Sequence, residues 1–178
     1  MVSLRTLSPT RGPRLHNVSM PTVDALDARL LQLLAAEPDV GVLGASRRLG
    51  VARGTVQSRL DRLVARGVIA SFAPRLDAAA LGYPVTAFCT LEIRQGGRGH
   101  GPVVEHLLAI PEVLEAHTIT GTGDLLIRVV ARDNADLQRV IDLVVDERHV
   151  VRAATAISLS ELIGLRHLPL VDAARQQQ

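Results

Sequence analysis

The sequence predicts an α+β protein with two domains: three short helices, followed by strands and helices in the order βαββαβ. Three observations predict this class. Leucines and valines recur with helical spacing over residues 24–66, and alternating apolar and polar residues begin at Pro84. The strand and helix patterns that follow keep the order of the split unit of ferredoxin-like folds. The chain has 178 residues, of which 47% are hydrophobic, enough for two small cores.

The first helix is predicted from its start and stop signals. Asp24 and Asp27 are spaced as the N-cap and the third residue of a helix, where carboxylates meet free N–H groups. Pro38 ends the helix because the residue before a proline avoids the helical conformation. The apolar stripe between them consists of Leu26, Leu30, Leu33 and Leu34.

The next two helices have helix-turn-helix spacing. A weaker helix is expected at about residues 42–49 and another at about residues 53–65, with a tight turn at Gly50 between them. Gly67 is expected to stop the third helix in a left-handed conformation. Residues 68–75 are expected to form a short extended wing.

The second domain is predicted from alternating residues and amphipathic stretches. The expected elements are a strand at 84–94, a helix carrying Val103 to Leu108, strands at about 113–120 and 124–131, a helix carrying Leu137 to Val145, and a strand at about 150–162. The expected boundaries are a flexible arm at 1–21, the helix-turn-helix domain with its wing at 22–75, a linker at 76–83, the ferredoxin-like domain at 84–168 and a tail at 169–178.

The strands of the second domain have two different faces. The helix-covered face is expected to be apolar and to carry Val85, Cys89, Leu91, Ile127, Val129, Val151, Ile157 and Leu159. The other face mixes Phe88, Leu126 and Val130 with charged residues of both signs. Such a face suits an interface between subunits; the alternative is a solvated surface.

The outward side of the third helix suggests a contact with double-stranded DNA. A recognition helix needs small residues for close approach and Arg, Gln, Ser or Thr for base edges and phosphates. Residues 47–75 hold seven arginines against one aspartate, a local charge of +6 in a chain of net charge +2. The candidate DNA-binding residues are Arg53, Gly54, Thr55, Gln57, Ser58, Arg59 and Arg62, with Arg47 and Arg48.

The turn at residues 121–124 allows two interpretations. In the first, Gly121 and Gly123 supply positive φ angles for a hairpin, and Asp124 accepts from nearby backbone N–H groups. In the second, the exposed N–H groups of Gly121, Thr122 and Gly123 and the carboxylate of Asp124 bind the charged end of an amino acid. The residues alone leave both interpretations open.

Several classes of function find no support in the sequence. Cys89 is the only cysteine, so no internal disulfide can form, and the chain is expected to work in the cytoplasm without a membrane span. The glycine-rich loop from Gln95 to Gly101 lacks the lysine of a phosphate-binding loop and is interpreted as a connector. The histidines lack metal-ligand spacing, and no catalytic arrangement can be singled out. We therefore expect no cofactor, no metal and no enzymatic activity.

Spaced motifs from Val23 to Leu168 resemble the Lrp/AsnC, or feast/famine, family of transcriptional regulators. The resemblance is carried by Val23–Asp27 with Leu30–Leu31, by Arg53–Leu63 with Gly67–Ile69, by Leu81–Gly82, by Ile110–Val113, and by Thr120–Gly121 with Asp124–Leu126. It implies a homodimer formed through the C-terminal sheets, often assembled into tetramers or octamers, and amino acids or related metabolites as effectors. It also implies an effector site near the turn at residues 121–124, with Thr155 as a further lining residue.

The chain departs from the family pattern at two places. Ala52 stands where the family usually has a serine capping the recognition helix, and loss of such a cap costs about 0.5–2 kcal/mol. The second helix contains Gly44 and follows Gly41, and a glycine inside a helix costs about 1 kcal/mol relative to alanine. The weakened second helix leaves open a sensor or partner protein that does not bind DNA. A second alternative, a tetrapyrrole decarboxylase-like enzyme on the same scaffold, stays open because some of these enzymes resemble the family in fold.

Overall fold

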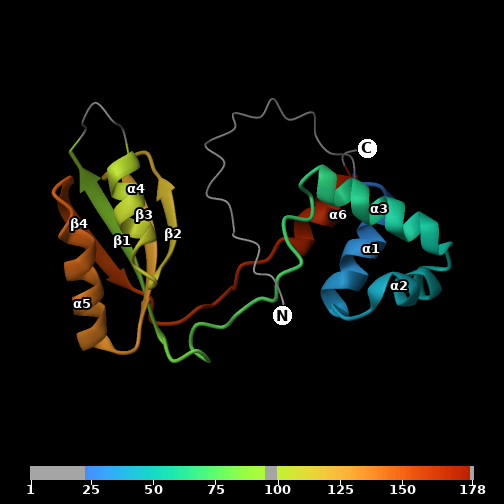
Figure 1. Ribbon diagram of the computed structural model, residues 1–178, viewed down its shortest axis with the longest axis horizontal. Coiled ribbons are helices and arrows are strands. Elements are labelled where there is room, and N and C mark those ends of the chain that lie inside the picture. Colours follow the sequence, from blue (N-terminus) through green and yellow to red (C-terminus); the bar gives the residue numbers. More distant parts are fainter. Residues whose placement is uncertain (1–22, 95–99, 177–178) are drawn as a thin grey trace, which may run out of the picture. The chain divides into compact units, whose positions relative to one another are not determined.

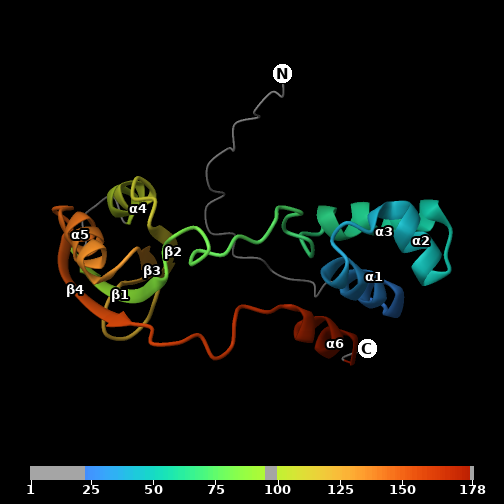
Figure 2. The same ribbon diagram turned by 90° about the horizontal axis from the view of Figure 1, so that it is seen from below.

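The computed structural model describes residues 23–94 and 100–176. They form two compact units: the first contains the residues up to Ala73 and those from Leu165 onward, and the second is Pro74–Gly164 (Figure 1, Figure 2). The expected arm at residues 1–21 and most of the glycine-rich loop lie outside the described residues. We call the first unit the head and the second the sensor unit.

The head is built on three helices that start and stop close to the predicted positions. They are α1 (Ala25–Ala36), α2 (Gly41–Leu49) and α3 (Arg53–Ala65). The Asp24 carboxylate accepts from the backbone N–H groups of Leu26 and Asp27, each at 2.9 Å, and the Asp27 side chain accepts from the Asp24 backbone. This reciprocal capping box confirms the predicted start of the first helix.

The core of the head joins all three helices. Leu30 of α1, Ala45 of α2 and both Val56 and Leu63 of α3 are at most 1% exposed and form one cluster. Gly50 has a φ of 68° in the tight turn between α2 and α3, and Gly67 has a φ of 73°, the left-handed conformation expected at the end of α3. Residues 68–77 follow without a regular strand, so the expected wing contains no strand of its own.

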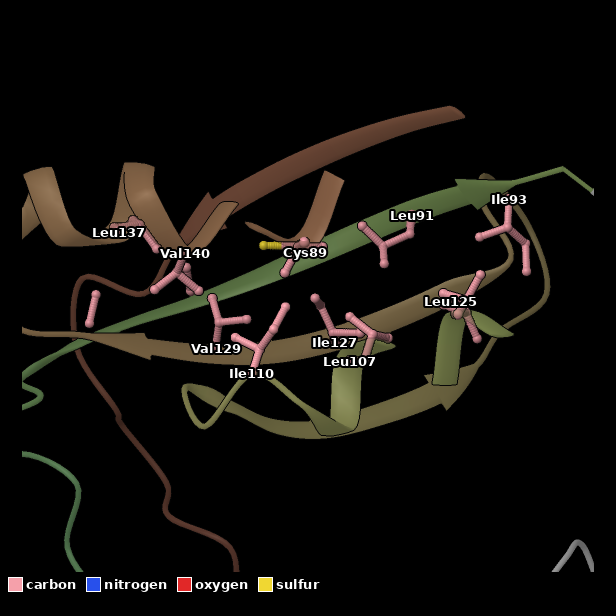
Figure 3. Packing of buried hydrophobic residues seen from close by; sticks show 14 residues of the cluster. Cys89, Leu91, Ile93, Leu107, Ile110, Leu125, Ile127, Val129, Leu137 and Val140 are labelled. Carbon is pink, nitrogen blue, oxygen red and sulfur yellow. The ribbon is translucent and has the colours of Figure 1, made fainter. Parts of the chain in front are cut away.

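The sensor unit has the predicted βαββαβ order. Its elements are β1 (Val85–Ile93), α4 (Gly101–Leu108), β2 (Val113–Thr118), β3 (Leu125–Ala131), α5 (Asn134–Val145) and β4 (Val150–Ile157). The four strands form one antiparallel sheet in the order β2-β3-β1-β4. Side chains from β1 and β3 pack against those of α4 and α5 on one face of the sheet (Figure 3).

Three residues expected on the helix-covered face are exposed instead. Val151 is 59% exposed, Ile157 is 49% exposed and Leu159 is 98% exposed. The reason is the position of β4, which pairs only with β1 at the edge of the sheet and ends at Ile157 rather than at about residue 162. Val130, expected on the open face, is only 3% exposed.

The expected tail at residues 169–178 is a helix over most of its length. This helix, α6 (Leu168–Gln176), belongs to the head, where it contacts α1. The chain therefore leaves the head at Ala73, builds the sensor unit and rejoins the head at Leu165.

Candidate nucleic-acid interface and effector turn

The N-terminal half of α3 presents a surface of small, polar and basic residues without large apolar side chains. All five of its candidate DNA-binding residues are exposed: Arg53, Gly54, Thr55, Gln57 and Ser58. The first N–H groups of a helix have no partner inside the helix, and the Ala52 side chain provides no cap at this end. This end of α3 can therefore offer backbone donors, a positive dipole end and the Arg53 guanidinium to a phosphate.

Arg59 and Arg62, also expected to contact DNA, are bonded to carboxylates of α1. Arg59 Nη1 lies 3.0 Å from Asp27 Oδ1 and also bonds to Asp24, and Arg62 Nη2 lies 2.6 Å from Asp27 Oδ2. Asp27 has no exposed area. Helical spacing placed both arginines on the outward side of α3 and did not indicate these bonds. In the structure, the ion pairs of both arginines are with Asp27 of α1 and its N-cap residue Asp24.

The pairing with Arg59 changes the acidity of Asp24. Partial burial alone raises the pKa of this carboxyl, but hydrogen bonds from Arg59 and from the backbone of Asp27 and Leu26 outweigh it and lower the pKa to about 2. Asp24 is therefore ionised at neutral pH and holds the recognition helix to α1.

The arginines of α2 differ in their contacts. Arg47 is exposed in the last turn of α2, and Arg48, next to it, forms an ion pair with Glu37 at the end of α1. Arg29 of α1 donates to the Leu49 carbonyl at 3.4 Å. Arg47 and Arg53 are thus the two candidate arginines of α2 and α3 whose predicted role in binding DNA meets no competing ion pair among the described contacts.

The turn at residues 121–124 is fastened to the end of β1. The Asp124 carboxylate accepts from the Ile93 N–H at 2.8 Å, and the Asp124 N–H donates to the Leu91 carbonyl at 2.8 Å. For Asp124, the first of the two interpretations is therefore correct: its carboxylate accepts from a backbone N–H group. A Cβ atom added to Gly123 would lie 2.3 Å from Thr90 Cγ2, whereas one added to Gly121 would meet open space.

Thr155 lies on a different strand from the turn. Its hydroxyl donates to Cys89 Sγ at 3.3 Å, and β1 separates β4 from β3 in the sheet. Burial raises the pKa of the Cys89 thiol, and the hydrogen bond from Thr155 partly offsets this. Within one chain the predicted effector residues are therefore divided between the turn at one side of β1 and β4 at the other.

A buried ionic network explains a motif whose role the sequence did not reveal. Glu112 and Asp136 are 8% and 7% exposed, and Arg139 bonds to both, at 2.5 Å and 2.8 Å. Arg132 adds hydrogen bonds to Asp136, and together these bonds hold the pKa of the Asp136 carboxyl well below its usual range. The Ile110–Val113 motif thus fastens the start of β2 to α5 through Arg139, and this partner of Glu112 could not be deduced from spacing.

The described residues contain neither a cluster of potential metal ligands nor a helix fit to cross a membrane. In the ranges 23–94 and 100–176, no three His, Cys, Asp or Glu side chains are grouped so that they could hold a metal ion. Among the helices of the same ranges, none combines the length and the apolar character needed to span a bilayer.

Comparison with known proteins agrees with this two-part architecture. Residues 23–70 match the family described as winged helix-turn-helix DNA-binding, and residues 86–167 match the Lrp/AsnC ligand binding domain. An uncharacterised HTH-type transcriptional regulator of Pyrococcus horikoshii is 33% identical over 142 residues, which cover 78% of this chain and 95% of that protein. The HTH-type transcriptional regulator FL11 of Pyrococcus furiosus is 27% identical over 122 residues, covering 68% of this chain and 80% of that protein.

Solved structures share the fold. E. coli AsnC aligns with a TM-score of 0.74 at 24% identity and covers 83% of this chain and 99% of its own. A transcriptional regulator from Neisseria meningitidis, solved as a complex with L-Met, aligns with a TM-score of 0.72 at 23% identity, covering 80% of this chain and 94% of its own. Because both family matches occur in the same order as the two units, this chain belongs to the Lrp/AsnC family of DNA-binding transcriptional regulators.

Proposed function

We propose that this regulator inserts α3 into the major groove and that an amino acid bound by the sensor unit changes its affinity for DNA. The observation that supports this most directly is the N-terminal half of α3, where five exposed small, polar or basic residues, interrupted only by the buried Val56, lie outside the ion pairs of the head. Contacts from Arg47 and Arg53 to phosphates would position the helix, and Gln57 and Ser58 would face base edges. Arg48, Arg59 and Arg62, which are ion-paired with carboxylates of the head, would add positive charge near the DNA.

The DNA contact is tested by the salt dependence of binding. Arg53→Ala should weaken binding to the promoter DNA of the protein's own gene and reduce the slope of log K against log salt by roughly 1, since one phosphate contact is lost. Arg148→Ala, an exposed arginine of the sensor unit, is the matched control and should leave the slope unchanged. Wild-type protein that fails to bind duplex DNA at low salt would favour a sensor without DNA binding.

The proposed effector site is the turn at residues 121–124. Gly121 has a φ of 111° and open space beside it, and two of the structurally similar regulators were solved with L-methionine. Gly121→Thr should abolish the effect of amino acids on DNA binding and leave DNA binding alone largely intact. The check is a thermal-shift screen of amino acids followed by mobility-shift assays, and an unchanged ligand-binding isotherm in the variant would contradict the assignment.

A homodimer through the open face of the sheet is the proposed assembly, with tetramers or octamers as its multiples. Phe88 is 41% exposed on that face, and two cross-strand pairs flank it, Glu115–Arg128 at 3.1 Å and Glu92–Arg152 at 3.8 Å. An exposed aromatic ring between charge pairs suits a self-complementary interface. Light scattering of Phe88→Asp should show a monomer, with Leu114→Asp, another exposed apolar residue of the sheet, as the comparison.

The cytoplasmic location expected from the sequence stays a prediction.

A further inference from the structure

The C-terminal helix α6 lies outside the part of the chain that matches the family. The ligand-binding match ends at residue 167, and α6 begins at Leu168. Although α6 follows the sensor unit in the sequence, it belongs to the head and lies against α1 (Figure 1, Figure 2). The head is consequently joined to the sensor unit by two segments of chain, one before β1 and one after β4.

The contact between α6 and α1 is specific in its side chains. Gln32 Nε2 donates to Asp172 Oδ1 at 3.1 Å. Ala28, one turn before Gln32 on α1, is only 1% exposed. The bond between Gln32 and Asp172 joins two helices whose bonded residues are 140 positions apart in the sequence.

The two sides of α6 differ in exposure. Val171, Asp172 and Ala174 are half-buried, whereas the neighbouring Leu170 is 63% exposed. Asp172, which accepts from Gln32, is among the half-buried residues, so the half-buried side of α6 faces α1. A nine-residue helix docked through such a small area is expected to open at low free energy, as a switchable element must.

Helix α1 is the common neighbour of α6 and the recognition helix. Its Gln32 bonds to Asp172 of α6, and its Asp27 bonds to Arg59 and Arg62 of α3. We propose that α6 is a regulatory strap: changes at the end of β4 draw α6 onto α1 or release it, and α1 passes the change to α3 through Asp27. This coupling rests on the proposed function, since it needs both DNA binding and an effector response.

A pair of substitutions at neighbouring positions of α6, one half-buried and one exposed, tests the strap in the full chain. Val171→Asp places a charge on the side that faces α1, and Leu170→Asp makes the same change on the exposed side. Hydrogen exchange of peptides covering Ala25–Ala36 should become faster in Val171→Asp and stay as in wild type in Leu170→Asp. The amino-acid effect on DNA affinity should fall at least about fivefold in Val171→Asp only, the lower end of usual allosteric coupling.

Gln32→Ala should reproduce a weaker form of the Val171→Asp effect. Its matched control is Gln138→Ala, which removes a similar exposed hydrogen bond, to Asp142 at 2.8 Å, from α5. Equal exchange of α1 in both α6 variants and wild type would show that α6 is not docked and would overturn the proposal. Faster exchange with an unchanged effector response would overturn the coupling. Wild-type protein that ignores DNA and amino acids would refute the proposed function, while the exchange data would still decide whether α6 is docked.

Discussion

At the scale of single residues, Asp27 connects the two helices on which the head depends. Its carboxylate has no exposed area and accepts from two arginines of α3, at 3.0 Å and 2.6 Å, as well as closing the capping box of α1. A carboxylate buried in this way is tolerated because charged donors and a backbone N–H replace its hydration. Asp27 therefore fixes the position of α3 on α1.

Asp27→Asn should destabilise the head without removing any apolar contact. The neutral amide cannot compensate both guanidinium groups, and breaking a fully buried ion pair costs about 3–5 kcal/mol. Because Arg59 and Arg62 reach solvent, with side chains 25% and 43% exposed, we expect a smaller loss of roughly 1–3 kcal/mol. Urea unfolding measures this loss in the free energy of unfolding. Asp61→Asn, which affects only an exposed hydrogen bond from Gln57, should be nearly neutral; an equal loss in both variants would contradict this role of Asp27.

The sequence revealed one part of the Asp27 site and not the other. Its spacing from Asp24 predicted the capping box because a cap depends on residues three positions apart. The bonds to Arg59 and Arg62 join residues 32 and 35 positions apart, and no local spacing reports such contacts. The same limit applies to Glu112, whose motif was evident but whose partner Arg139 lies on another element.

At the scale of elements, the helices of the head were predicted closely and the last strand was not. Start and stop signals such as Asp24, Gly50 and Gly67 are local, so the bounds of α1, α2 and α3 followed from them. The end of β4 depends instead on whether a neighbouring strand continues beside it. Ser158 makes the last bond to Thr86, and the apolar residues that follow are exposed although their spacing suggested a strand.

The start of α3 offers a stabilising substitution. Ala52 has the extended conformation of an N-cap, with φ −62° and ψ 146°, but its side chain makes no capping bond. Ala52→Ser should stabilise the head by about 0.5–1 kcal/mol, because the hydroxyl would accept from an N–H of the first turn. The urea midpoint of the head measures this gain. Ala65→Ser, at the other end of α3, is the control and should give no gain; equal midpoints for the two variants would count against capping.

The turn before β3 contains two glycines that should respond differently to alanine. Gly121 and Gly123 have φ angles of 111° and 121°, so each variant carries backbone strain of about 1–3 kcal/mol. Gly123→Ala should lose more stability than Gly121→Ala, since its Cβ would also overlap Thr90. Thermal unfolding of the sensor unit ranks the two. Equal losses would mean that the close approach to Thr90 has no energetic consequence.

At the scale of the whole molecule, the order of elements was predictable and the return of the chain to the head was not. Alternation and helical spacing predicted the βαββαβ order because each element has its own periodicity. Residues 169–178 were expected to be a tail and instead lie largely in α6. Its contact with α1 joins residues 140 positions apart, at Gln32 and Asp172.

Both units contain a carboxylate whose ionised form is held by arginine, so the whole molecule should lose stability in acid. The pKa of Asp24 is lowered to about 2 and that of Asp136 is lowered further, against about 3.9 for an unfolded aspartate. The stabilisation from each is therefore present above about pH 4 and is lost as the pH falls through the folded pKa. Urea midpoints should be nearly constant from about pH 7 to 5 and fall at about pH 4 to 3. In Asp136→Asn the sensor unit should be weaker at neutral pH but less sensitive to acid, because its amide does not titrate; an unchanged slope against pH would contradict the role of this network.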